Sequence, residues 1–334
     1  MRRGLVSLIV ALALLGGCAH ATQAKEPAPP QQSAVRLPST WPQRVAMADD
    51  GSVWITDEYR GVVRLDPEGR VREYTIGEED GVAADIVDGA DGAVWFAGIE
   101  TVGRIDRTGK VETWRVGGFG LARAITAMDE TFWFTNEGAP GRIERPSAAG
   151  VTTGFSVTGA RASFAMTGIA AGPDGALWFT QRGYGRDAPD GIGRMTTDGG
   201  YSSWRLPRRR AAPIRLTAGS DGALWFTQQD AHAIGRITTT GAISEFRLRT
   251  GLSPYDITAG TDGAVWFTAD GCIGRTPRPA TSPRGRSATS DGWLGSPPLP
   301  TAASGSPTTS RAPSGTSPRQ GATLLVPPRA TRPR

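Results

Sequence analysis

Short apolar stretches, each built around a tryptophan and separated by glycine-rich turns, recur along most of the chain. They read GSVWIT (51–56), GAVWFA (92–97), ETFWFT (130–135), GALWFT (175–180 and 222–227) and GAVWFT (263–268). The tryptophans Trp54, Trp95, Trp133, Trp178, Trp225 and Trp266 follow one another at intervals of 38 to 47 residues. Beyond the N-terminal leader, no long segment has the apolar spacing of a helix. The pattern therefore predicts a repeated β-sheet module.

The fifth unit shows most clearly that each module contains four short strands. We expect its strands at 214–218, 223–227, 234–238 and 243–248, joined in part by Asp221-Gly222 and Thr240-Gly241 turns. Four-stranded modules of this length pack around a central axis as the blades of a propeller. We predict an all-β fold, a β-propeller of four-stranded blades over residues 41–275. Six blades are recognisable, the sixth is incomplete, and a seventh is lost or replaced by the tail.

Two side chains that recur in every module have structural explanations. The tryptophan rings are expected to wedge between neighbouring blades as packing residues. An arginine recurs in VVRL (62–65), VGRI (102–105), PGRI (140–143), IGRM (192–195) and IGRI (234–237). We expect this arginine to form a salt bridge or a hydrogen bond between neighbouring blades. Its presence in every unit argues against a catalytic role for any single copy.

Residues 1–18 are typical of a bacterial lipoprotein signal peptide. Arg2 and Arg3 precede an apolar stretch from Leu5 to Leu15, which is followed by Gly-Gly-Cys18. Lipidation of Cys18 would make the protein an exported, membrane-anchored lipoprotein of the cell envelope, held there by its acyl chains. An ordinary secretory signal with an incidental cysteine is the alternative. Residues 19–40 are polar and proline-rich, as in a tether.

Residues 276–334 break the repeat in the middle of a motif. They hold 12 of the 25 prolines, with many serines, threonines and arginines, and are typical of a low-complexity disordered tail. One explanation is a genuine basic tail, and the other is a shifted reading frame near codon 276 that erased blade seven. The segment 33–38 resembles an outer strand that could close the ring, but with blade seven lost we expect it to have no sheet to join.

Charge and composition exclude several classes of protein. The chain has a formal net charge of +5 and a pI near 9.7, yet the excess lies in the leader and the tail. Residues 19–275 carry about four more acidic than basic side chains, so nucleic acid is not an expected partner. Two cysteines exclude a disulfide scaffold, and two histidines leave little for a multi-histidine metal site.

The motifs D-G-x-[VL]-W-F-T and I-G-R-I-T, with a strand ending in E-F-x-L, resemble the streptogramin B lyases, also called virginiamycin B lyases. The resemblance covers about residues 41–275. It implies a seven-bladed propeller that opens cyclic depsipeptide antibiotics at the ester bond by elimination, with a bound Mg²⁺ ion. It also implies a histidine base and a metal-binding glutamate in blade seven, a second histidine at the start of blade six, and a substrate-binding tyrosine at the start of blade one.

The residues at the family's functional positions differ in this chain. Gln43 stands where the tyrosine would be, Tyr255 replaces the blade-six histidine, and the blade-seven motif has no match. His232 lies in a loop and is not assigned as the base. We therefore assign no catalytic residue and no metal ligand, and Mg²⁺ rests on the resemblance alone.

Ligands of propellers bind where the inner strands converge at one end of the channel. The candidate residues at this channel mouth are the strand starts Gln43, Arg123, Thr167 and Tyr255, and the residues after the W-F-T strands, Asp57, Asn136, Gln181 and Gln228.

Three functions follow from these observations. The first is the streptogramin lyase reaction. The second is a non-catalytic, envelope-anchored propeller that binds a small molecule, cyclic or other peptide, or glycan as a monomer. The third is a calcium-dependent lactone hydrolase, for which acidic ligands are sparse.

Overall fold

The computed structural model describes the repeat region and two short segments outside it. The described residues are 33–36, 42–57, 61–76, 82–89, 92–116, 121–129, 131–137, 141–146, 152–157, 164–184, 189–248, 251–260, 263–270, 272–276 and 323–326. They contain strands and connecting turns but no helix, and hence no helix that could cross a membrane. Residues 1–32, and with them Cys18 and most of the tether, lie outside the described residues, as does most of the tail.

The strands form six blades and one small additional sheet. Blade one holds β2 (Pro42–Met47), β3 (Val53–Asp57), β4 (Gly61–Leu65) and β5 (Val71–Tyr74); blade two holds β6 (Ala83–Asp88), β7 (Val94–Gly98), β8 (Thr101–Ile105) and β9 (Val111–Arg115). Blade three holds β10 (Ala122–Met128), β11 (Thr131–Asn136), β12 (Arg142–Pro146) and β13 (Thr152–Ser156). Blade four holds β14 (Phe164–Ala165), β15 (Ile169–Ala171), β16 (Leu177–Gly183), β17 (Gly191–Met195) and β18 (Tyr201–Arg205). Blade five holds β19 (Pro213–Ala218), β20 (Ala223–Gln228), β21 (Ala233–Thr238) and β22 (Ile243–Arg247), and blade six holds β23 (Pro254–Ala259), β24 (Val265–Ala269) and β25 (Cys272–Arg275).

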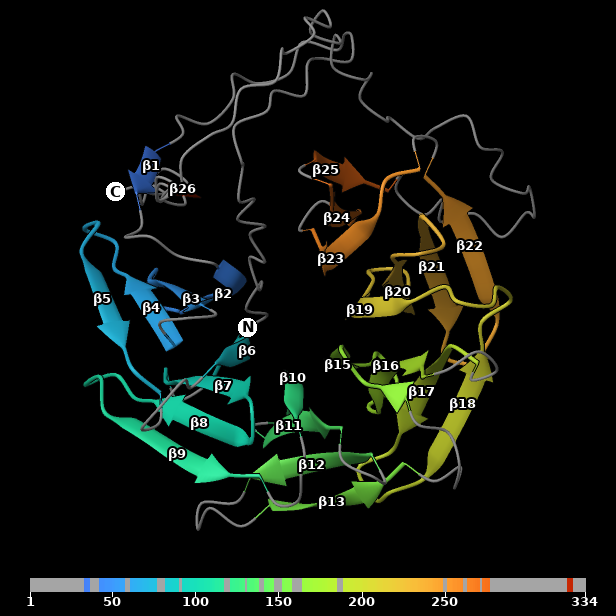
Figure 1. The fold of residues 1–334 in the computed structure, drawn as a ribbon, viewed down its shortest axis with the longest axis horizontal. Coiled ribbons are helices and arrows are strands. Elements are labelled where there is room, and N and C mark those ends of the chain that lie inside the picture. Colours follow the sequence, from blue (N-terminus) through green and yellow to red (C-terminus); the bar gives the residue numbers. More distant parts are fainter. Residues whose placement is uncertain are drawn as a thin grey trace, which may run out of the picture.

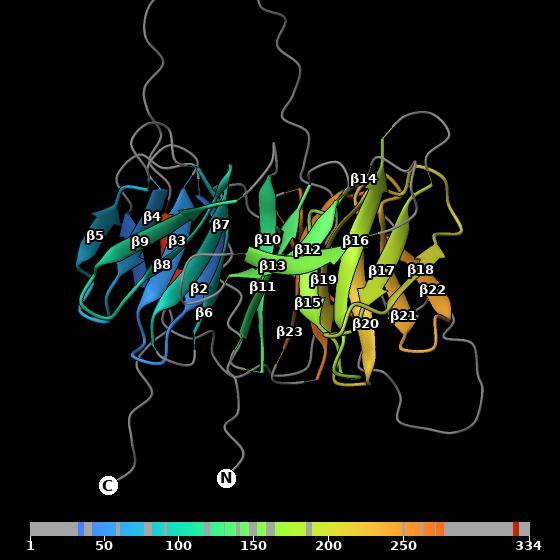
Figure 2. The ribbon, with the colours of Figure 1, turned by 90° about the horizontal axis from the view of Figure 1, so that it is seen from below.

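The blades are arranged radially around an axis, with the first strand of each blade innermost (Figure 1). Seen from the side, they form a flat ring whose strands run between its two faces (Figure 2). All strand pairs within the blades are antiparallel. The predicted all-β propeller is confirmed. In the fifth unit the expected strands agree with β19 to β22 to within one residue at each end.

The two short segments outside the six blades pair with each other. β1 (Ser33–Arg36) and β26 (Thr323–Val326) form a two-stranded antiparallel sheet, in which Ser33 faces Val326. The sheet lies in the gap between blade six and blade one (Figure 1). The expectation that the segment at 33–38 has no sheet to join is therefore wrong, because four residues of the tail provide a partner strand. β1 precedes the inner strand β2 in the chain, as the outer strand of each blade precedes the inner strand of the next.

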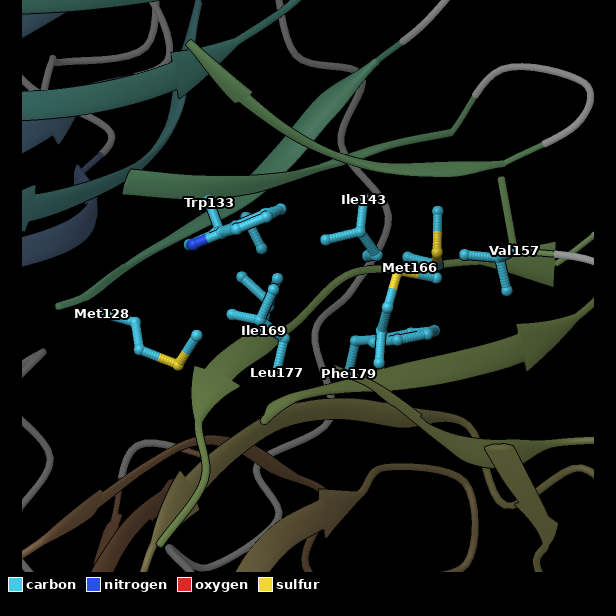
Figure 3. Packing of buried hydrophobic residues seen from close by; sticks show 10 residues of the cluster. Met128, Trp133, Ile143, Val157, Met166, Ile169, Leu177 and Phe179 are labelled. Carbon is cyan, nitrogen blue, oxygen red and sulfur yellow. The ribbon is translucent and has the colours of Figure 1, made fainter. Parts of the chain in front are cut away.

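The recurring tryptophan and phenylalanine form the packing between blades. Neighbouring residues of a strand point to opposite faces of the sheet, so the tryptophan faces the next blade and the phenylalanine faces the previous one. Trp133 of blade three therefore shares a core with Phe179 of blade four, together with Met166 and Leu177 (Figure 3). Trp54, Trp133, Trp178 and Trp225 are at most 5% exposed, which confirms their predicted packing role.

The glycine of the Ile-Gly-Arg-Ile motif is required by the phenylalanine on the adjacent strand. Phe226 faces Gly235 in the register of β20 and β21, and a Cβ at Gly235 would overlap the Phe226 ring. The same pairing joins Phe96 to Gly103, Phe179 to Gly193 and Phe267 to Gly274. In blade one the pair is Ile55 and Val63 instead. Where isoleucine replaces the larger phenylalanine on one strand, valine thus replaces the smaller glycine on the other.

The recurring arginine bonds within its own blade, so the prediction of a bond between blades is wrong. The Nε of Arg236 lies 2.7 Å from Oδ2 of Asp221, whose Oδ1 accepts the indole N–H of Trp225 at 3.1 Å. The guanidinium of Arg236 lies over the same indole ring. The Asp-Gly turn, the tryptophan and the arginine therefore stabilise one another inside blade five, and Asp174, Trp178 and Arg194 do the same in blade four.

Blade three departs from this register by three residues. Phe134 pairs with Glu144, and the guanidinium of Arg145 lies over Trp133. The equivalent of the recurring arginine is therefore Arg145, whereas the sequence motif PGRI suggested Arg142. Arg142 instead contacts Glu144, with its Nε 2.6 Å from Oε1.

Candidate functional site

Each of five inner strands begins with an irregularity at the same end of the propeller. The ladder register shifts between Pro42 and Arg44, and likewise after Ala83, Ala122, Pro213 and Pro254. A shift of this kind leaves residues unpaired and redirects their side chains. The side chains at these strand starts therefore point in directions that differ from those of a regular ladder.

The threonine of the W-F-T motif supports this irregular backbone. Its hydroxyl accepts the freed N–H of the inner strand in five blades; in blade five, Thr227 accepts from Arg215 at 3.1 Å. The Thr227 hydroxyl also lies 3.1 Å from the carbonyl oxygen of Tyr255 in blade six, to which it donates. One buried hydroxyl therefore fixes the strand start and connects two blades.

Four charged side chains from different blades meet where the inner strands begin. Arg44 of blade one lies 2.6 Å (Nη1 to Oδ2) from Asp256 of blade six and 3.8 Å (Nε to Oδ1) from Asp85 of blade two. Arg215 of blade five reaches across to Asp85, with Nη1 3.0 Å from Oδ2. We call these four residues the axial charge cluster. Its two guanidiniums and two carboxylates connect blades one, two, five and six.

Asp85 is the central carboxylate of the axial charge cluster. Its oxygens accept the backbone N–H groups of Ile86 at 3.0 Å and of Ile125 at 3.1 Å. Burial raises the pKa of Asp85 to about 7, against the opposing effect of the Arg44 charge. The sequence analysis did not predict this cluster. Aligned repeats carry a signal for it, because the third residue of β2, β6, β19 and β23 is charged and the sign of the charge alternates along the chain.

The predicted strand-start residues differ in exposure. Gln43 and Arg123 are exposed, Thr167 is partly buried, and Tyr255 is 46% exposed. Arg123 is held by Glu137, with its Nε 3.0 Å from Oε2. The Thr167 hydroxyl donates to the carbonyl oxygen of Ile214 at 2.9 Å, so it also connects two blades. These four predicted residues thus supply an amide, a guanidinium, a hydroxyl and a phenol.

The residues after the W-F-T strands, predicted as candidates to line the channel mouth, are buried. Asp57 and Gln228 are 0% exposed, Asn136 2% and Gln181 5%. The Asn136 amide N–H donates to Glu144 Oε2 at 3.3 Å, and the Gln181 amide N–H donates to the Tyr201 hydroxyl at 2.8 Å. Asn136 and Gln181 thus bond inside their own blades, whereas the buried amide of Gln228 has no hydrogen-bond partner among the described residues. The two predicted groups are therefore not brought together into one surface.

The described residues do not fit a magnesium ion. Among them, no three His, Cys, Asp or Glu side chains converge as a metal site. Mg²⁺ prefers carboxylates and waters in octahedral array, whereas Asp85 and Asp256 both face the Arg44 guanidinium. His232 is exposed in the loop after β20, with Nδ1 3.4 Å from Ser253 Oγ. No described histidine lies at the strand starts.

Comparison with known proteins agrees with the propeller fold. Residues 29–280 match the model of the virginiamycin B lyase family. A virginiamycin B lyase from Nocardia farcinica (strain IFM 10152) is 29% identical over 178 residues, which are 52% of this chain and 58% of that protein. The chain therefore spans less than two thirds of that relative's length.

Two solved structures are also similar. A streptogramin B lyase superposes with a TM-score of 0.65 at 31% identity, covering 73% of this chain and 83% of the other. A catalytically inactive virginiamycin B lyase from Staphylococcus aureus with quinupristin gives a TM-score of 0.62 at 29% identity, covering 70% and 79%. By its repeats, its fold and these matches, the chain belongs to the virginiamycin B lyase family.

Proposed function

We propose that this chain is a binding member of its family, which holds a cyclic depsipeptide or similar peptide at the channel mouth without opening the ring. The observation that carries the proposal is the axial charge cluster. Arg44 is ion-paired with both Asp85 and Asp256, and Arg215 is ion-paired with Asp85. These acids are therefore engaged and poorly placed to remove a proton from a ligand.

The mouth retains groups suited to a peptide ligand. Gln43 and Arg123 supply an amide and a guanidinium for ligand carbonyls, and Tyr255 supplies an exposed ring for apolar or aromatic side chains. The ring openings of elimination and hydrolysis each need a positioned base or an activated water. The described strand starts provide hydrogen-bonding groups but no histidine for that role.

Elimination is the second candidate, because the chain belongs to a family named for that reaction. The test incubates the full chain with quinupristin, with added Mg²⁺ and separately with a chelator, and follows binding by calorimetry and products by mass spectrometry. Binding with unchanged quinupristin supports the proposal. A ring-opened product of unchanged mass establishes elimination, and a product heavier by one water establishes hydrolysis.

Variants locate the site. Tyr255→Ala and Arg123→Ala should each weaken quinupristin binding, whereas Arg115→Ala, an exposed arginine on an outer strand, should not. Tyr255→Phe distinguishes the ring from the hydroxyl. No detectable binding by the wild-type chain, or equal weakening by Arg115→Ala, overturns the proposal.

A further inference from the structure

A cleft lies where the connections between blades four, five and six meet. This cleft of about 600 Å³ is lined by Arg208, Arg209, Arg210 and Arg247, together with His232 and Asp230. The arginines come from two segments, the connection from β18 to β19 and the end of β22. We call this the rim cleft. Neither the motifs nor the channel mouth accounts for it.

The charge of the rim cleft is opposite to that of the surrounding domain. Four arginines and one aspartate line it, whereas residues 19–275 as a whole carry about four more acidic than basic side chains. Asp230 lies 3.6 Å (Oδ2 to Nη2) from Arg182, and Arg208 is paired with Glu245 at 3.1 Å. After this pairing the lining still carries a positive excess. A concave surface with one sign of charge concentrates its field and attracts ions of the opposite sign.

The walls of the rim cleft are fixed before any ligand arrives. Asp190, which is 4% exposed, accepts N–H groups from Gly183 and Ala212, both at 2.9 Å. The carbonyl of Ala211 accepts the N–H groups of Asp230 and Ala231, which ties the arginine segment to the next loop. The Leu248 N–H donates to the carbonyl of His232 at 2.9 Å, joining the third wall.

Two lining residues adopt a backbone conformation that side chains disfavour. Arg210 has φ 55° and His232 has φ 50°, in the left-handed region where glycine or asparagine is usual. Such strain persists only where the surroundings enforce it, and it is concentrated at functional sites. Here it turns an arginine and a histidine toward a common cleft.

We propose that the rim cleft binds a small soluble ligand bearing a phosphate monoester, such as a phosphorylated sugar. Guanidinium groups match phosphate oxygens in bidentate geometry and hold their charge at all physiological pH values. Several arginines around one cleft favour a dianion over a single carboxylate. The volume is in the range of small-ligand pockets and exceeds what inorganic phosphate alone would fill. This site is independent of the ligand proposed for the channel mouth.

The test is calorimetric titration of the full chain with glucose 6-phosphate, inorganic phosphate and glucose. We expect binding of glucose 6-phosphate, weaker binding of inorganic phosphate, none of glucose, and a loss of affinity as salt is raised. Vesicles of phosphatidylglycerol and of phosphatidylcholine form a further arm. Binding to phosphatidylglycerol without binding of glucose 6-phosphate would overturn the soluble-ligand proposal in favour of a lipid headgroup.

Two variants and one control make the test specific. Arg210→Asn removes a guanidinium while placing a residue that tolerates the left-handed backbone, so its fold should be retained. Arg247→Gln and its control Arg115→Gln both alter the last residue of an outer strand, in blades five and two. We expect Arg210→Asn and Arg247→Gln to weaken glucose 6-phosphate binding by about tenfold, as for loss of a charged hydrogen bond. Equal weakening by Arg115→Gln, or no binding by the wild-type chain, would refute the site.

Discussion

Thr227→Val tests whether the threonine hydroxyl of the W-F-T motif connects one blade to the next. Thr227 is 0% exposed, accepts the Arg215 N–H at 3.1 Å and donates to the Tyr255 carbonyl at 3.1 Å. Valine keeps the branched shape but removes the hydroxyl. One backbone donor and one backbone acceptor then lose a partner in a partly buried place.

The expected loss follows from the cost of unpaired buried polar groups, which is about 1–3 kcal/mol for each. Because water reaches part of this region, we expect Thr227→Val to lower the free energy of unfolding by about 2–4 kcal/mol. For a domain of this size that corresponds to roughly 4–16 °C in melting temperature. The measurement is thermal and urea unfolding followed by circular dichroism.

The control is Thr113→Val, on the exposed face of outer strand β9. A surface change of this kind is usually within about 0.5 kcal/mol. If Thr227→Val costs no more than Thr113→Val, the hydroxyl is not a connection between blades and the reasoning fails.

Three further predictions follow from the same structure. Gly235→Val should lower the free energy of unfolding by about 1–3 kcal/mol through overpacking against Phe226. The double variant Phe226→Ile/Gly235→Val copies the Ile55–Val63 pair of blade one and should recover at least half of that loss in urea unfolding. Additive losses from the two substitutions would contradict this prediction. The pKa of Asp85 is raised to about 7 from 3.8, so folding takes up a proton and the free energy of unfolding should fall as pH rises from 4 to 7. Asp85→Asn should flatten that slope, and an unchanged slope would show that Asp85 is not its source. Cys18→Ser should move the protein expressed in bacteria from the detergent phase to the aqueous phase on phase separation if Cys18 carries lipid, and unaltered partitioning would argue against the anchor.

Much of the fold could be predicted from the sequence because propeller blades are local structures. Each strand pairs with its neighbour in the chain, and turn glycines such as Gly222 (φ 73°) and Gly241 (φ 93°) mark where one strand ends. The apolar runs between them therefore place the strands of blade five to within a residue. Blade three shows the limit of this reasoning. Its PGRI motif matches by letters, but packing of Arg145 over Trp133 selects a register three residues away.

The sequence by itself determined the repeated module, the all-β class and the packing role of the tryptophans, since these depend on apolar spacing over a few residues. Only the tertiary structure decided which side chains meet on the axis. Arg215 and Asp85 are 130 residues apart in the chain, yet Nη1 of Arg215 lies 3.0 Å from Oδ2 of Asp85 in the fold. It also decided that Asp57, Asn136, Gln181 and Gln228 are buried, and that Ser33–Arg36 pairs with Thr323–Val326. The physical reason is that local patterns fix each blade, whereas the packing of successive blades around the axis, which brings distant side chains together, depends on all of them at once.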